Sequence, residues 1–176
     1  MQTSSSASKG TPPGGGGATA QALSSGWNRV QNWETFKYLA IQGGSNEGNG
    51  ANVIQWTQSF KPDGTTTYDQ QWGLARNSEG FYSFRNAGTP DWKALTVNGN
   101  NNRNGERIIQ WQYSAANRFQ QWYIDWWEGG PYFRLVNRGS GKCLAVAGGG
   151  NPANGTQIIQ WECGLGADQF WVLYAE

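Results

Sequence analysis

Residues 49–56 read NGANVIQW, and the same pattern returns as NGERIIQW in residues 104–111 and as NGTQIIQW in residues 154–161. A Gln-x-Trp triplet follows each copy, and the three triplets end at Trp72, Trp122 and Trp171. Self-similarity at a period of about fifty residues is typical of one supersecondary unit repeated along a chain, so the sequence predicts three equivalent units. A ligand site in one unit can therefore occur up to three times.

Alternating apolar residues precede each copy, and a period of two is typical of a half-buried β-strand. The alternating pairs are Leu39 and Ile41, Leu95 and Val97, and Leu144 and Val146. No segment shows sustained helical periodicity. We therefore expect all-β units of three or four short strands, spanning residues 27–79, 80–129 and 130–176. Three such units favour a closed threefold barrel, because closure removes exposed sheet edges.

The first 26 residues consist mainly of Ser, Gly, Thr, Ala and Pro. Such a segment buries too little apolar surface to offset the entropy of ordering, so we expect residues 1–26 to form a flexible linker or arm. A basic stretch followed by an apolar stretch is missing, so the segment does not match a secretory signal peptide. Residues 27–176 suit one compact domain.

Charged residues are few and balanced, with 13 Lys and Arg against 12 Asp and Glu and a net charge of +1. This balance predicts no nucleic-acid partner, and no apolar run is long enough to span a membrane. The chain has no histidine and 2 cysteines, so we expect no metal site and no cofactor. The chain instead offers aromatic faces from its 11 tryptophans and uncharged hydrogen-bonding amides from its many Asn and Gln residues.

These motifs resemble those of the ricin-type β-trefoil lectins, a family named for its threefold Gln-x-Trp motif. The resemblance covers residues 27–176. It rests on three evenly spaced triplets, each with an upstream Lys-x-Leu-x-(Val/Ile) segment and the eight-residue pattern. It implies an all-β β-trefoil of pseudo-threefold symmetry. It also implies up to three shallow sugar pockets and no catalytic residues.

Cys143 and Cys163 stand where this family places a disulfide within one repeat. The implied bond would close a loop of about twenty residues and stabilise the fold by about 3 kcal/mol. It would also imply an oxidising, secreted or extracellular location, although the chain shows no signal peptide. The residues themselves leave two buried free thiols as an alternative.

Carried over by position, the sugar-binding aromatic residues are Trp56, Trp111 and Trp161. The carried-over amide residues are Gln70, Gln120 and Gln169. Sugars are bound by stacking one ring face on an aromatic side chain and by hydrogen bonds to vicinal hydroxyl groups. The residues alone leave the three tryptophans as either core side chains or sugar platforms.

The family's usual Asp, on the strand before each eight-residue pattern, is replaced here by Ala40, Thr96 and Ala145. We therefore expect the hydroxyl acceptor to lie across the pocket, at Asp69 in the first repeat and Asp168 in the third. The second repeat has Phe119 at that position, which predicts the least competent site. Solvated loop residues are the alternative for both Asp side chains.

Non-catalytic carbohydrate binding is the function that the sequence favours, with galactose-type or xylan-type glycans as partners. The alternative is a structural or self-assembling trefoil with lost or weak sugar binding, in which residues 1–26 mediate assembly. Glycoside hydrolysis would require two carboxylates at a defined separation, and the repeats show no matched pair. Trp27, Trp33, Trp92, Trp126 and Trp127 lie outside the repeated positions, and exposed members of this set would serve glycan or protein contacts.

Overall fold

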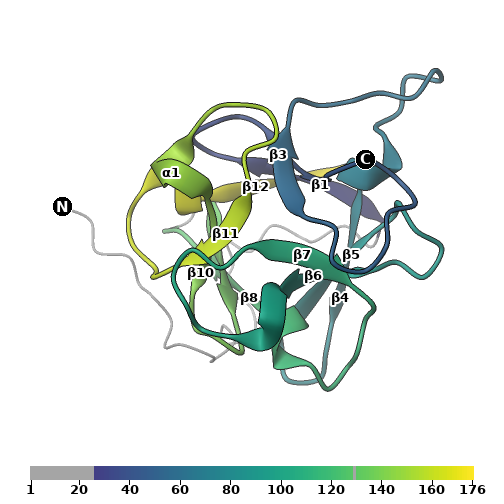
Figure 1. The fold of residues 1–176 in the computed structure, drawn as a ribbon. Helices are drawn as coiled ribbons and strands as arrows, with labels where there is room; N and C mark the ends of the chain where they lie inside the picture. Colours follow the sequence, from purple (N-terminus) through teal and green to yellow (C-terminus); the bar gives the residue numbers. More distant parts are fainter. Residues whose placement is uncertain (1–25, 129) are drawn as a thin grey trace.

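A computed structural model describes residues 26–128 and 130–176 (Figure 1). Apart from Gly26, the predicted linker of residues 1–26 and the self-association assigned to it lie outside these residues. The described residues form an all-β fold of 12 strands, and each repeat contributes four of them. The fold is a β-trefoil, as the sequence predicts.

Strands in the first repeat are β1 (Trp27–Asn32), β2 (Tyr38–Ile41), β3 (Val53–Trp56) and β4 (Trp72–Arg76). Those of the second are β5 (Tyr82–Asn86), β6 (Ala94–Val97), β7 (Ile108–Trp111) and β8 (Trp122–Trp126). Those of the third are β9 (Phe133–Asn137), β10 (Cys143–Val146), β11 (Ile158–Trp161) and β12 (Trp171–Ala175). Short helical turns are η1 (Tyr68–Gln70), η2 (Asn98–Asn100), η3 (Arg118–Gln120), η4 (Ala167–Gln169) and α1 (Ala147–Gly150).

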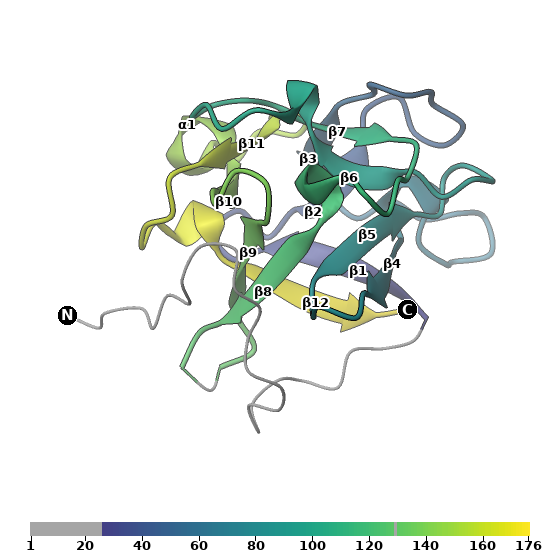
Figure 2. The same ribbon diagram turned by 90° about the horizontal axis from the view of Figure 1, so that it is seen from below.

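Six strands close into a barrel in which every neighbouring pair is antiparallel. The pairs run from β1 to β4, β5, β8, β9 and β12, and β12 returns to β1. The other six strands form three hairpins, β2–β3, β6–β7 and β10–β11. Figure 2 shows β3, β7 and β11 gathered at one end, above the barrel strands β8, β9, β12 and β1.

The tryptophans of the Gln-x-Trp triplets form the centre of the core. Trp72, Trp122 and Trp171 are each 0% exposed. Each indole N–H donates to the carbonyl of the leucine in the same repeat's second strand. These bonds join Trp72 to Leu39 over 3.1 Å, Trp122 to Leu95 over 3.0 Å and Trp171 to Leu144 over 3.1 Å. The motif therefore supplies apolar volume and also satisfies the one polar atom that it buries.

The Asn and Gln residues of the eight-residue pattern form hydrogen bonds between neighbouring repeats at the Asn-Gly turns. The Asn side chain accepts a backbone N–H from the residue after the neighbouring repeat's pattern Trp. The pairs are Asn49 with Gln112, Asn104 with Glu162 and Asn154 with Thr57. The buried Gln of each pattern donates its amide to the same neighbouring turn, as Gln110 does to the carbonyl of Glu47 over 2.8 Å.

Cys143 and Cys163 form a disulfide, with 5.0 Å between their Cα atoms. The bond lies within the third repeat and joins β10 to the segment after β11. The alternative of two free thiols is therefore excluded. Cys143 is fully buried with Phe81, Tyr123 and Val136 in a small second apolar cluster.

Candidate functional site

The pattern tryptophans end the third strand of each repeat and face outward. Trp56 is 40% exposed, Trp111 46% and Trp161 47%. The three residues before each of them lie mostly inside the fold, so the strand leaves the core at the indole. These values exclude the core alternative for all three tryptophans.

Each exposed indole rests on the Asn-Gly turn of the neighbouring repeat. A side chain at Gly50 would contact the ring of Trp111, one at Gly105 the ring of Trp161, and one at Gly155 the ring of Trp56. The backbone φ angles of these glycines are 89°, 83° and 84°, a conformation that favours glycine. The turn therefore holds one edge of each ring and leaves the rest accessible.

The triplet glutamines lie beneath the loops that join the third and fourth strands. Gln70 is 0% exposed; its Oε1 accepts from the backbone N–H of Ser59 over 3.0 Å and its Nε2 donates to the carbonyl of Thr57 over 2.9 Å. Equivalent pairs are Ser114 and Gln112 for Gln120, and Gly164 and Glu162 for Gln169. The loop backbone therefore engages both ends of each amide.

The positions of the family's usual Asp are closed to solvent. Ala40 and Ala145 are 1% exposed and Thr96 is 3% exposed. The hydroxyl of Thr96 donates to the carbonyl of Ala94 over 2.7 Å and accepts from Nε2 of Gln120 over 3.2 Å. These residues offer no free acceptor for a sugar hydroxyl.

Asp69 and Asp168 are half-buried at the turns η1 and η4, beside the first and third sites. Loss of solvent raises the pKa of Asp69. Loss of solvent also raises the pKa of Asp168, and the charge of Glu34 raises it further. Neither carboxylate forms an ion pair with a Lys or Arg of the described chain. Both are therefore partly dehydrated acceptors.

Glu34 is a residue that the sequence does not single out. It belongs to the first repeat, yet a side chain at Gly150 would collide with its carboxylate, beside the third site. The equivalent residue is Gly88 beside Asp69, and Gly139 against the ring of Phe119. The loop after the first strand of the next repeat thus completes each site. Only contacts between repeats reveal this, and no local sequence pattern encodes them.

The second repeat carries an open hollow of about 740 Å³. Its lining includes Asn100, Trp111, Tyr113, Asn117, Arg118 and Phe119. The side-chain amide of Asn117 donates to Oδ1 of Asn100 over 3.4 Å. This repeat is predicted to have the least competent site because it lacks an acid; the structure shows that it has space and amide groups instead.

Two further hollows use tryptophans from outside the repeated positions. One, of about 370 Å³, is lined by Trp33, Trp127, Tyr132, Leu165, Ala167 and Phe170. The other, of about 430 Å³, includes Trp27, Arg85 and Trp92. Within the described ranges, no cluster of three or more His, Cys, Asp or Glu side chains is placed to hold a metal ion. No helix in this part of the chain has the length and hydropathy to cross a membrane.

The closed barrel, the three hairpins and the repeated rim tryptophans define a β-trefoil domain of the lectin type. The chain belongs to the ricin-type β-trefoil lectin domain-like family, whose model matches residues 18–111 and 118–176. No curated protein matches the chain.

Solved structures share the fold. The designed threefold-symmetric protein ThreeFoil is 29% identical, with a TM-score of 0.75 over 85% of this chain and 99% of its own. An exo-β-1,3-galactanase from Clostridium thermocellum is 25% identical, with a TM-score of 0.75, and the match covers 89% of this chain but 31% of the enzyme. A Macrolepiota procera ricin B-like lectin, solved with lactose, is 19% identical, with a TM-score of 0.69 over 89% of this chain and 100% of its own.

Proposed function

We propose that the protein is a non-catalytic lectin or carbohydrate-binding module, and that sugars bind against Trp56, Trp111 and Trp161. The observation that carries this proposal is the exposure of these three indoles, between 40% and 47%, at equivalent positions of a lectin-type fold. A flat indole held at one edge by a turn offers its open area to the apolar face of a pyranose ring.

Hydroxyl groups would be bound differently in the three repeats. Asp69 and Asp168 are the proposed acceptors in the first and third, because an incompletely hydrated carboxylate gains most from a new donor. In the second repeat, Asn100 and Asn117 are the available amides. Direct contact by Gln70, Gln120 or Gln169 stays a prediction, and it requires a hydroxyl to replace one of their bonds to the loop.

The proposed ligands are galactose-type glycans, with xylan-type glycans as the second choice. The solved relative with lactose and the galactanase support the first choice. The disulfide supports a secreted or extracellular location.

A structural trefoil without sugar binding is the second candidate function. The observation that favours it is the closure of all three usual Asp positions by Ala40, Thr96 and Ala145. Assembly through residues 1–26 would belong to this function.

Isothermal titration of the full chain with lactose and with xylotriose tests the proposal. We expect heat with at least one probe, and loss of that heat in the triple variant Trp56→Ala, Trp111→Ala, Trp161→Ala. Tyr174→Ala is the matched control, because Tyr174 is 42% exposed and lies on the barrel strand β12, outside the three sites. Unaltered binding by the triple variant would exclude these sites. A featureless titration with both sugars would favour the structural trefoil.

A further inference from the structure

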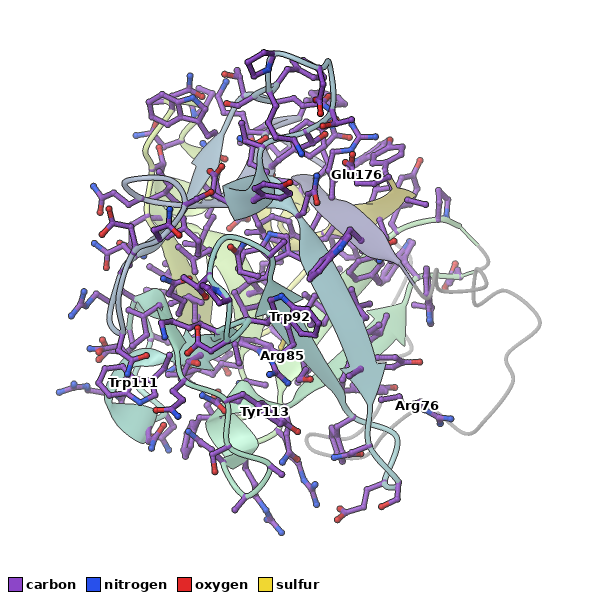
Figure 3. All side chains as sticks on the ribbon, turned by 90° about the vertical axis from the view of Figure 1, so that its right-hand side faces the viewer. Arg76, Arg85, Trp92, Trp111, Tyr113 and Glu176 are labelled. Carbon is purple, nitrogen blue, oxygen red and sulfur yellow. A yellow bond between two sulfur atoms is a disulfide. The ribbon has the colours of Figure 1, made fainter. Side chains whose placement is uncertain are left out.

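A second hollow lies beside the site of the second repeat and is built from residues outside the repeated pattern. It measures about 430 Å³ and is lined by Trp27, Gly73, Arg85 and Trp92 among others. The rings of Trp27 and Trp92 meet edge to face, with 5.6 Å between their centroids. Figure 3 shows Arg85 between Trp92 and Tyr113, with Trp111 further along the same face of the molecule.

Arg85 is held in this hollow by a backbone carbonyl and an aromatic ring, without an ion pair to a carboxylate. Its Nε donates to the carbonyl of Trp92 over 2.6 Å, and its guanidinium carbon lies 3.9 Å from the centroid of the Tyr113 ring. Among the described residues, no carboxylate pairs with it, because the nearby Asp91 binds Lys93 at 2.5 Å. The two terminal nitrogens have no acceptor within the described part of the chain, and they remain available for a ligand.

Trp92 has a backbone conformation that bulky residues rarely adopt, with φ at 48°. It ends the turn after β5, where the backbone N–H of Asn86 donates to the carbonyl of Lys93. The first and third repeats close shorter turns by the equivalent bond, from Asn32 to Lys37 and from Asn137 to Lys142, and place Phe36 (φ 59°) and Gly141 (φ 70°) before the lysine. Trp92 keeps at this position an indole that is 50% exposed. An exposed large side chain at a strained position points to a function rather than to folding.

The chemistry of this hollow fits the acidic group of a sugar. A guanidinium presents parallel N–H donors to a carboxylate or sulfate, and this pairing is stronger than one between neutral groups. The indole faces of Trp27 and Trp92 can contact the sugar ring. Tyr113 lines the larger hollow of the second repeat and also stacks on Arg85, so the two hollows meet at this pair.

We propose that Arg85, Trp92 and Trp27 form a subsite for an acidic sugar residue of a glycan whose neighbouring residue occupies the site at Trp111. The inference rests on the proposed function, because it takes the ligand to be a glycan. It adds a preference for charged glycans, through residues that have no counterpart in the repeated motif.

Titration of the full chain with trigalacturonate and with its methyl ester tests the subsite, because the two probes differ in charge but share a backbone. We expect trigalacturonate to bind about tenfold to a hundredfold more tightly, the factor contributed by one or two hydrogen bonds between charged groups. Added NaCl should reduce this preference, because salt screens the attraction. A galactose trisaccharide sulfated at O6 shows whether sulfate serves as well as carboxylate.

Arg85→Gln should abolish the preference for trigalacturonate and leave lactose binding unchanged. Arg85→Lys keeps the charge without the paired donors, and we expect it to restore only part of the preference. Arg76→Gln is the matched control, since Arg76 is an exposed arginine on the adjacent strand β4. Trp92→Gly should leave the protein folded, because glycine adopts the positive φ of this position more readily than tryptophan, while it weakens trigalacturonate binding.

Two outcomes would separate failure of the subsite from failure of the proposed function. Equal affinity for trigalacturonate and its ester, with lactose still bound, overturns the subsite alone. The subsite is also overturned if Arg85→Gln remains folded and keeps the preference for trigalacturonate. Absence of binding by lactose, xylotriose and both trigalacturonate probes overturns the proposed function together with the subsite.

Discussion

Asn154 of the third repeat accepts a hydrogen bond from the backbone N–H of Thr57 in the first repeat, over 2.9 Å. Asn49 and Asn104 make the same bond to the following repeats. Three equivalent bonds thus link the repeats in a closed ring, and each lies beside an exposed indole. The Asn of the eight-residue pattern, which recurs in every repeat, therefore links neighbouring repeats.

Replacing Asn154 with Ala should destabilise the fold without changing its architecture. The lost hydrogen bond is exposed, so we expect a decrease in the free energy of unfolding of about 1 kcal/mol. For a domain of this size that corresponds to a fall in unfolding temperature of about 2–4 °C, measured by circular dichroism. Ser78→Ala, in the exposed turn that joins β4 to β5, should cause no comparable fall. Equal changes in unfolding temperature for the two variants would contradict the stabilising role of the Asn154 hydrogen bond.

Reduction of the bond between Cys143 and Cys163 should lower stability more strongly. The bond closes a loop over a sequence separation of 20, for which the chain-entropy model gives about 3 kcal/mol. We expect unfolding at a clearly lower temperature in dithiothreitol, and the same shift in a double Cys→Ala variant regardless of reductant. Thiol titration of the denatured, unreduced protein is the check: two reactive thiols would show that the bond does not form.

Glu106 should make stability depend on acid pH. Hydrogen bonds from Asn98, first, and from Asn101 and Arg103 lower the pKa of this carboxyl from 4.5 to about 2. The unfolded chain therefore takes up the proton first as pH falls, so the stabilisation is complete above pH 4.5 and is lost towards pH 2. Urea denaturation of wild type and Glu106→Gln between pH 6 and pH 2 should give curves that differ at pH 6 and converge at low pH. Parallel curves would rule this out.

Asp69→Asn together with Asp168→Asn should separate binding from stability. Burial raises the pKa of both carboxyls, so the folded state holds their protons more readily than the unfolded state, and their charge destabilises the fold once pH rises through the folded pKa. We expect the double variant to unfold at an equal or higher temperature at pH 7 while it loses sugar affinity in the first and third sites. Asp63→Asn removes an exposed carboxylate from a loop and should leave binding intact. Undiminished glycan affinity in the double variant would exclude the acids as acceptors.

The sequence predicts the barrel because the unit that forms it is repeated three times. The alternating apolar residues predict one strand of each hairpin. The burial of Trp72 and its two counterparts is a finding of the structure. The exposure of Trp56 could not be predicted, because the alternation of apolar and polar residues does not indicate whether the last residue of a strand lies in the core or at the surface. Glu34 and Arg85 could not be predicted for another reason: each acts across repeats or between loops, where position depends on packing that no short pattern encodes.

Strand β12 pairs with β1 along its whole length, from Asn28 opposite Ala175 to Asn32 opposite Trp171. The turns after β4 and β8 join strands that are paired in the same way. Strands β12 and β1 are therefore paired like the two strands of a hairpin, but no turn connects residue 176 to residue 27. A circular permutant can be designed that joins residue 176 to residue 27 by a short Gly-Asn linker and has its new termini between Asn77 and Gly80. We expect this permutant to keep the trefoil, because the packing of the repeats does not depend on their order in the chain.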